Sequence, residues 1–213
     1  MEDDPLAKIG AWLDEAQTLS SRRNPLAMAL ATCSEEGVPA VRMVLAKGLC
    51  RTTGHVVFYT HFNSRKGSEL TAVPRAAAVW YWEEFGGRQL RIEGSVTRSP
   101  DSESDAYFAT RPAGSQINAW VSRQSQTLEP GDSLESSAAQ KAQTLSLSQA
   151  ALAQPAEIPR PAHWGGFRLW IERVEFWSEG AGRFHEREFY ERTAAPGENA
   201  DNALRWRMKR LQP

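Results

Sequence analysis

The pattern of apolar and polar positions along the chain predicts a mainly β protein with peripheral helices. Short apolar runs rich in β-branched and aromatic residues follow one another, and turns that contain glycine or proline separate them. Successive runs are close enough to pair as hairpins, so the pattern favours an antiparallel β-barrel with helices attached, an α+β fold. The strands are expected at 27–33, 38–47, 55–60, 75–82, 88–99, 165–177, 183–192 and 204–211.

Helices are expected at the N-terminus and in the longer connections. An aspartate–proline pair opens an amphipathic N-terminal helical segment within 1–24. Ser64 is suited to cap a short helix after the third strand. The Ser-, Ala- and Gln-rich stretch 126–163 is expected to be a polar connection with one surface helix. Because the length suits one substantial core, residues 1–213 are predicted to form a single domain.

The segment 107–125 carries the densest set of polar side chains in the chain. Tyr107 and Arg111 are four residues apart, so they would share one face of a helix that Pro112 interrupts. Ser115 follows where a second helix would start, and the unpaired N–H groups of such a start, beside an arginine, suit a phosphate. The alternative is that the arginines of this segment are solvated and its tryptophan belongs to the core.

Two further groups of cations indicate an anion. Arg65 and Lys66 would lie in the first turn of the helix capped by Ser64, where positive charge opposes the helix dipole unless an anion is bound. Arg183, His185 and Arg187 alternate along a predicted strand and would therefore project from one face. The alternatives are an exposed basic pair and a charged edge strand that deters aggregation.

Composition narrows the possible functions. The 25 Lys and Arg residues balance 26 Asp and Glu residues, which gives no reason to expect general attraction to nucleic acid. The 2 cysteines and 4 histidines are scattered, so neither a metal site nor a disulfide framework is expected. The acidic N-terminus does not resemble a signal peptide, and the expected location is cytoplasmic.

A series of motifs runs from about residue 25 to the end of the chain. They are RMVLAK (42–47), FYT (58–60), SRKG (64–67), RQLRIEG (88–94), YFATRP and SQINAWVSRQS within 107–125, WGGFRL (164–169), VEFW (174–177), RFHER (183–187) and the terminal KRLQP. In these residues and in this order, the motifs resemble those of the pyridoxamine 5'-phosphate oxidase family, whose members are FMN-dependent split-barrel enzymes.

The resemblance implies roles for individual residues. Those that match cofactor-contacting positions are Arg42, Lys47, Tyr59, Thr60, Arg65, Lys66, Gln89, Gln124, Ser125, Trp177 and Arg187. Those that match substrate-holding positions, chiefly for the substrate phosphate, are Lys47, Tyr107, Arg111 and Ser115. Arg183 and His185 match the pair beside the substrate ring and the reacting carbon. The chain departs from the usual family pattern at Asn118, Phe184 and Glu186, which are neighbours of matched positions.

The implied reaction oxidises pyridoxamine 5'-phosphate or pyridoxine 5'-phosphate to pyridoxal 5'-phosphate, with FMN as cofactor and dioxygen reduced to hydrogen peroxide. The resemblance also implies a homodimer with FMN at the subunit interface, and no nucleic-acid or membrane partner. One alternative is a related FMN oxidase of the phenazine-biosynthesis type, which the chain resembles at THFNSRKGSEL, at FHEREFY and at the terminal RLQP. Another is a split barrel that binds flavin or haem without catalysis.

Overall fold

A computed structural model describes residues 4–146, 148, 151–193 and 206–213. Contacts within the chain divide it into two compact units. Unit 1 comprises the described residues within Met1–Phe58, Glu69–Thr97 and Arg168–Pro213, and unit 2 comprises Tyr59–Ser68 and the described residues within Arg98–Phe167. The single-domain organisation stays a prediction.

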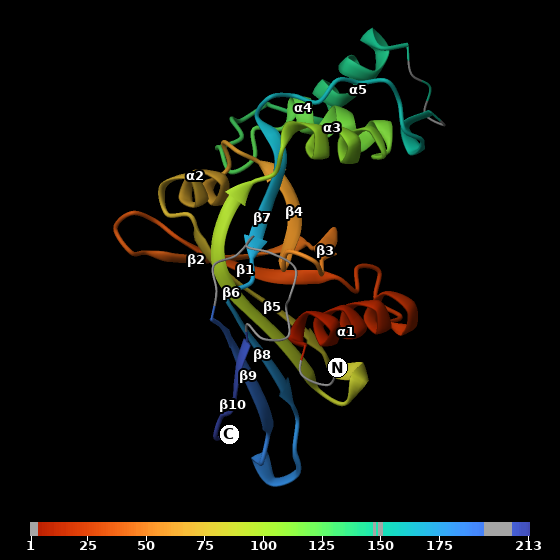
Figure 1. The fold of residues 1–213 in the computed structure, drawn as a ribbon. Coiled ribbons are helices and arrows are strands. Elements are labelled where there is room, and N and C mark those ends of the chain that lie inside the picture. Colours follow the sequence, from red (N-terminus) through yellow and green to blue (C-terminus); the bar gives the residue numbers. More distant parts are fainter. Residues whose placement is uncertain (1–3, 147, 149–150, 194–205) are drawn as a thin grey trace. The chain divides into compact units, whose positions relative to one another are not determined.

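An antiparallel sheet dominates unit 1 (Figure 1). Its strand order is β10-β9-β8-β6-β5-β1-β2, and β3 pairs with β4 beside this path. The predicted hairpins are confirmed, since β1 pairs with β2, β5 with β6 and β8 with β9. The strand bounds are β1 Ala27–Cys33, β2 Pro39–Leu45, β3 Gly48–Cys50, β4 His55–His61, β5 Arg75–Trp82, β6 Arg88–Arg98, β7 Trp164–Trp170, β8 Arg173–Ser178, β9 Glu186–Arg192 and β10 Trp206–Arg210. Strand β3 was not predicted.

Helix α1 (Pro5–Leu19) packs on the sheet of unit 1. The side chain of Asp4 caps it by accepting a hydrogen bond from the backbone N–H of Leu6 at 3.0 Å, as the aspartate–proline pair predicts. Four apolar side chains at helical spacing are buried beneath it, and Trp12 meets the ring of Phe176 edge-on at 5.0 Å. The predicted amphipathic helix is therefore confirmed.

The helices α3 (Asp101–Ala109), α4 (Ala113–Val121) and α5 (Leu134–Thr144) belong to unit 2. Helix α2 (Arg65–Ala72) also begins there. Ile117 of α4 and Ala142 of α5 are buried together with Ile158 in a small apolar core, which fixes the surface helix predicted for the polar connection. The 3₁₀ turns are η1 (Glu83–Phe85), η2 (Ala151–Ala153) and η3 (Ala181–Arg183). Among the described residues, no helix has the length and apolar character needed to cross a membrane.

The run 165–177 was predicted as one strand, and this prediction is wrong. It is divided between β7 and β8, because the chain turns at Ile171 and Glu172. There the backbone N–H of Glu172 donates to the carbonyl of Glu93 at 2.9 Å. The turn brings the carbonyl of Trp170 to 1.7 Å from where a Cβ on Gly94 would lie, so only glycine permits this approach.

Candidate functional site

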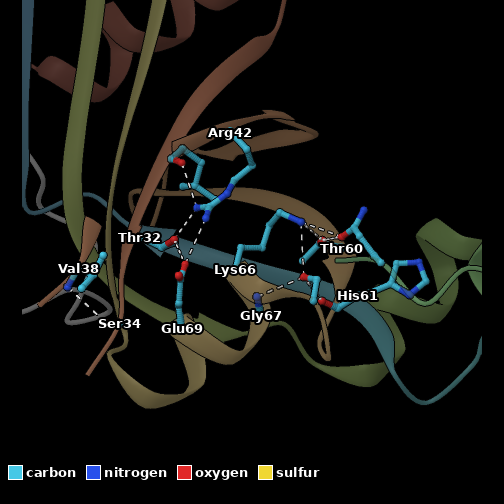
Figure 2. Close-up of polar contacts among 12 residues, drawn as sticks. Thr32, Ser34, Val38, Arg42, Thr60, His61, Lys66, Gly67 and Glu69 are labelled. Atoms are coloured by element: carbon cyan, nitrogen blue, oxygen red, sulfur yellow. Dashed lines mark hydrogen bonds and ion pairs between the residues drawn. The ribbon is translucent and has the colours of Figure 1, made fainter. Parts of the chain in front are cut away.

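A buried ammonium forms the centre of a polar cluster in unit 2. Lys66 is 7% exposed, and its Nζ donates to Gln124 Oε1 at 2.7 Å, to Thr60 Oγ1 at 3.1 Å and to Ser64 Oγ at 3.4 Å (Figure 2). Thr60 Oγ1 also donates to Gln124 Oε1 at 3.0 Å. These acceptors are neutral, so none of them cancels the charge of Lys66. Three residues that the sequence assigned to one site are thus brought together.

The start of helix α2 explains how Lys66 reaches this place. Ser64 is fully buried; its hydroxyl donates to the carbonyl of His61 at 2.7 Å and accepts from the N–H of Gly67 at 3.3 Å. This is the predicted N-cap. A Cβ on Gly67 would lie 2.2 Å from the carbonyl of Phe62, so glycine is needed for the first helical turn to approach strand β4. Arg65, beside Lys66 in this turn, is exposed.

Arg111 lies on an aromatic stack in the same unit. Tyr59 and Tyr107 stack with ring centroids 4.0 Å apart, and Tyr59 stacks on Trp164 at 5.5 Å. The guanidinium of Arg111 lies 4.5 Å from the ring centroid of Trp164 and 5.4 Å from that of Phe108, within the range of cation–π attraction. Its Nη1 atom is buried and has no hydrogen-bond partner among the described residues. Desolvation lowers the pKa of Arg111.

The position of Arg111 differs from the prediction. Helix α3 ends at Ala109, so Arg111 does not share a helical face with Tyr107; the stack brings the two together instead. The start of α4 also has fewer unpaired backbone N–H groups than the sequence predicted. The N–H of Ala113 donates to the carbonyl of Gln154 at 2.6 Å and that of Ser115 to the carbonyl of Pro112 at 2.8 Å, so the predicted open helix terminus is partly closed.

Two histidines that the sequence analysis missed lie beside these cations. The rings of His61 and His163 stack at 5.4 Å, and both line a pocket of about 290 Å³ with Trp120, Arg123 and Gln124. Burial, together with smaller electrostatic contributions from His163, Lys66 and Arg111, lowers the pKa of His61 to about 4. His61 is therefore neutral near pH 7. In the sequence, His61 directly follows the FYT motif, and this position could have identified it as a candidate site residue.

Ser125 follows Gln124 and adopts a left-handed backbone conformation, with φ of 75°. It lines a second hollow of about 630 Å³ together with Gln124 and the start of α5. Loop geometry, which a strand or helix pattern cannot predict, sets the position of both side chains.

In unit 1, Arg42 is held by three residues on two elements (Figure 2). Its Nη1 donates to the carbonyl of Leu30 at 3.2 Å and to Thr32 Oγ1, both on β1, and its Nη2 donates to Glu69 Oε2 on α2 at 3.2 Å. The Thr32 hydroxyl donates in turn to Glu69 Oε2. Thr32 and Glu69 are buried, and neither was predicted as part of a site.

The sequence predicted that Arg183, His185 and Arg187 project from one face of a strand, and this prediction is wrong. Strand β9 begins only at Glu186, because η3 turns the chain through Arg183, whose φ is 66°. His185 packs against Trp177 with ring centroids 4.6 Å apart. Trp177 is paired in register with both Gln89 and Arg187, which places these cofactor candidates on neighbouring strands.

Arg187 is paired with a carboxylate, so it does not require an anion as the sequence suggested. Its Nε donates to Glu175 Oε1 at 2.6 Å, and Arg91 Nη2 donates to Glu175 Oε2 at 2.8 Å. Burial would raise the pKa of Glu175, but the hydrogen bonds and charges of Arg187 and Arg91 outweigh burial and lower it. Glu175 therefore neutralises part of this positive charge.

Lys47 lies just beyond the end of β2, and its backbone N–H donates to the carbonyl of Val57 at 2.8 Å. Its side chain is exposed and lines a pocket of about 310 Å³ with Arg23 and Asn24. The lining of this pocket contains no other residue predicted for the site.

Comparisons with known proteins agree with the architecture and the motifs. Residues 14–144 match the family model described as pyridoxamine 5'-phosphate oxidase, and residues 164–213 match that of the pyridoxine 5'-phosphate oxidase C-terminal dimerisation region. The chain is 42% identical over 212 residues to a pyridoxine/pyridoxamine 5'-phosphate oxidase from Rubrobacter xylanophilus, covering 100% of this chain and 88% of the relative.

Two solved structures are similar in fold. The first, PhzG from Burkholderia lata 383 in complex with tetrahydrophenazine-1-carboxylic acid, has a TM-score of 0.81 at 30% identity, covering 99% of this chain and 93% of that one. The second, a pyridoxamine 5'-phosphate oxidase-related, FMN binding protein from Nostoc punctiforme, has a TM-score of 0.69 at 18% identity, covering 97% and 96%. The predicted split-barrel fold class is confirmed.

Proposed function

This chain belongs to the pyridoxamine 5'-phosphate oxidase family, and we propose that it oxidises pyridoxamine 5'-phosphate or pyridoxine 5'-phosphate to pyridoxal 5'-phosphate. The observation that carries the proposal is Arg111. A desolvated guanidinium with a buried, unpartnered N–H is costly unless an anion binds it, and the phosphate of a vitamin B6 compound supplies that anion.

The cluster around Lys66 fits the phosphate of FMN. Its buried ammonium donates to neutral oxygens of Thr60 and Gln124, and the cap at Ser64 fixes its position at the start of α2. An ammonium held in this way suits an anionic group such as a phosphate. We assign Thr60, Lys66 and Gln124 to the cofactor phosphate. The other cofactor residues proposed are Arg42, Lys47, Tyr59, Arg65, Gln89, Ser125, Trp177 and Arg187.

Arg111 and Tyr107 would hold the substrate phosphate, with Lys47 and Ser115 as further contacts. Stacking on Trp164 limits the guanidinium to a few orientations, so its fork is aligned before the substrate binds. Binding energy from the remote phosphate then positions the carbon that is oxidised.

Bound FMN would supply the redox chemistry: the 4'-carbon of the substrate would lose a hydride and dioxygen would be reduced to hydrogen peroxide, with water consumed and ammonia released when the substrate is the amine. The protein's own residues bind and orient. His185, held against Trp177, and Arg183 in the neighbouring turn would orient the substrate ring. The carboxylate of Glu175 accepts from the guanidinium of Arg187 and would keep it oriented for the cofactor.

We also infer a homodimer with FMN between its subunits. The support is the match of residues 164–213 to a dimerisation region, which includes Trp177, Arg183, His185 and Arg187. A site completed by a second subunit would link cofactor binding to assembly.

A phenazine-type oxidase is the second candidate, favoured by the structural similarity to PhzG. Sequence identity is 30% there against 42% over the full chain for the Rubrobacter enzyme, and an apolar tricyclic acid would not need a phosphate clamp at Arg111. The B6 oxidase is therefore the better-supported function.

The test is direct. The purified protein should show the absorbance of a bound flavin, and it should form pyridoxal 5'-phosphate and hydrogen peroxide from each phosphorylated vitamer. A flavin-containing protein that forms neither product would refute the proposed reaction while leaving FMN binding intact.

A further inference from the structure

We propose that Glu69 is a positioning residue that fixes Arg42 for cofactor binding, with the hydroxyl of Thr32 as its bridge. The inference rests on the proposed function, because it takes Arg42 to contact FMN. Neither Glu69 nor Thr32 was among the residues assigned to the site from the sequence.

The guanidinium of Arg42 makes several hydrogen bonds within the protein. Arg42 donates to the Leu30 carbonyl, to the Thr32 hydroxyl and to the Glu69 carboxylate, and the Thr32 hydroxyl donates to the same carboxylate oxygen. The three residues thus form a closed ring of hydrogen bonds (Figure 2). The rotamer of Arg42 is fixed from both Nη atoms.

Strand β2 carries Arg42. It is the last strand in the sheet order and has β1 as its neighbour there, with Arg42 paired in register with Leu30. A long side chain on such a strand loses rotamer freedom when it binds a ligand, unless other groups already hold it. Glu69 comes from α2, 27 residues away, and supplies that restraint from outside the hairpin.

The three side chains differ in burial. Glu69 is 7% exposed and Thr32 is 4% exposed, whereas the side chain of Arg42 is 21% exposed. Glu69 and Thr32 are buried, whereas part of the Arg42 side chain reaches the surface. The buried network therefore supports the guanidinium, which is the part of Arg42 that would contact a ligand. Arginine has five N–H donors, and contacts to the three acceptors leave donors for an additional anion.

The negative charge of Glu69 allows its positioning role to be separated from any electrostatic attraction of the cofactor. A carboxylate beside Arg42 offsets its positive charge, so Glu69 would contribute by position and not by attracting the cofactor. Glu69→Gln keeps an oxygen that accepts from Arg42 and removes the negative charge, and it should bind FMN at least as tightly as wild type. Glu69→Ala removes the acceptor and should weaken FMN binding about tenfold.

The experiment measures FMN affinity of the full chain by quenching of flavin fluorescence, with thermal unfolding measured in parallel. Thr32→Val should weaken binding and Thr32→Ser should not, because serine keeps the hydroxyl. In an Arg42→Ala background, Glu69→Ala should have no further effect, since Glu69 acts through Arg42. The matched control is Glu172→Ala, which breaks the contact of Glu172 with Arg75 (2.6 Å) elsewhere in unit 1 and should leave FMN affinity unchanged.

Three results would overturn the proposal. Glu69→Ala and Thr32→Val could lower the unfolding temperature with FMN affinity unchanged, which would make the network purely structural. The effect of Glu69→Ala could persist without Arg42, which would mean that Glu69 acts elsewhere. Wild-type protein that fails to bind FMN would overturn the proposed function itself. If wild type binds FMN and the variants bind it equally well, only the positioning role of Glu69 would be refuted. If Glu69→Ala does not fold, the FMN affinities of Thr32→Val, Thr32→Ser and Glu69→Gln still test the proposal.

Discussion

Replacing Lys66 by methionine should separate the role of the buried ammonium in cofactor binding from its role in the fold. Methionine matches the length of the lysine side chain and lacks the charge. The variant loses hydrogen bonds to Gln124 at 2.7 Å and to Thr60 at 3.1 Å, but the direct hydrogen bond from Thr60 to Gln124 remains. We therefore expect the free energy of unfolding to change by no more than about 1 kcal/mol.

The loss in FMN affinity should be larger. A hydrogen bond between an ammonium and a phosphate contributes about 1.5–3 kcal/mol, which corresponds to a dissociation constant for FMN about 10- to 150-fold higher. Riboflavin carries the same ring without the phosphate, so its affinity for Lys66→Met should stay within about threefold of wild type. Fluorescence titration of both flavins measures this, and Lys209→Met, which removes an ammonium that is 49% exposed on β10, is the control.

An equal loss for FMN and riboflavin would show that Lys66 supports the fold or the flavin ring, and the phosphate assignment would then be wrong. Unchanged FMN affinity would remove Lys66 from the site altogether.

Four other predictions follow from the same contacts. Arg111→Ala should raise KM for pyridoxamine 5'-phosphate at least about tenfold and Arg111→Lys should recover part of this, while steady-state kinetics with unphosphorylated pyridoxamine should barely change. Because the folded pKa of His61 is about 4, below its ordinary value of 6.5, the unfolded chain binds the proton first; the thermal stability of the ligand-free protein should fall as pH falls through this window, and His61→Asn should flatten the dependence. Glu175→Ala removes the carboxylate that Arg91 and Arg187 share, although Arg91 keeps Glu93 and both arginines are partly exposed, so it should reduce the free energy of unfolding by about 1.5–3 kcal/mol in urea titrations. Sedimentation over a dilution series should show that FMN strengthens dimerisation, and a monomer at saturating FMN would contradict the shared site.

The elements of the fold were largely predictable because their signals are local. Alternation and turn residues located most strands, and the caps at Asp4 and Ser64 marked two helix starts. Where the sequence prediction failed, contacts distant in sequence decided the outcome. The strand predicted across Ile171 breaks because its backbone bonds to Gly54 at 2.9 Å, and no local pattern encodes that carbonyl.

The candidate site shows the same division. The sequence alone determined which side chains carry the chemistry, through motifs whose residue types suit phosphate and flavin. Only the tertiary structure decided which groups each cation meets. Lys66 donates to the neutral side-chain oxygen of Gln124, 58 positions away, whereas Arg187 donates to the carboxylate of Glu175 across a strand pair, which offsets its positive charge. Hydrogen bonds and ion pairs form between groups that the fold brings within about 3 Å, and a sequence pattern does not contain those distances.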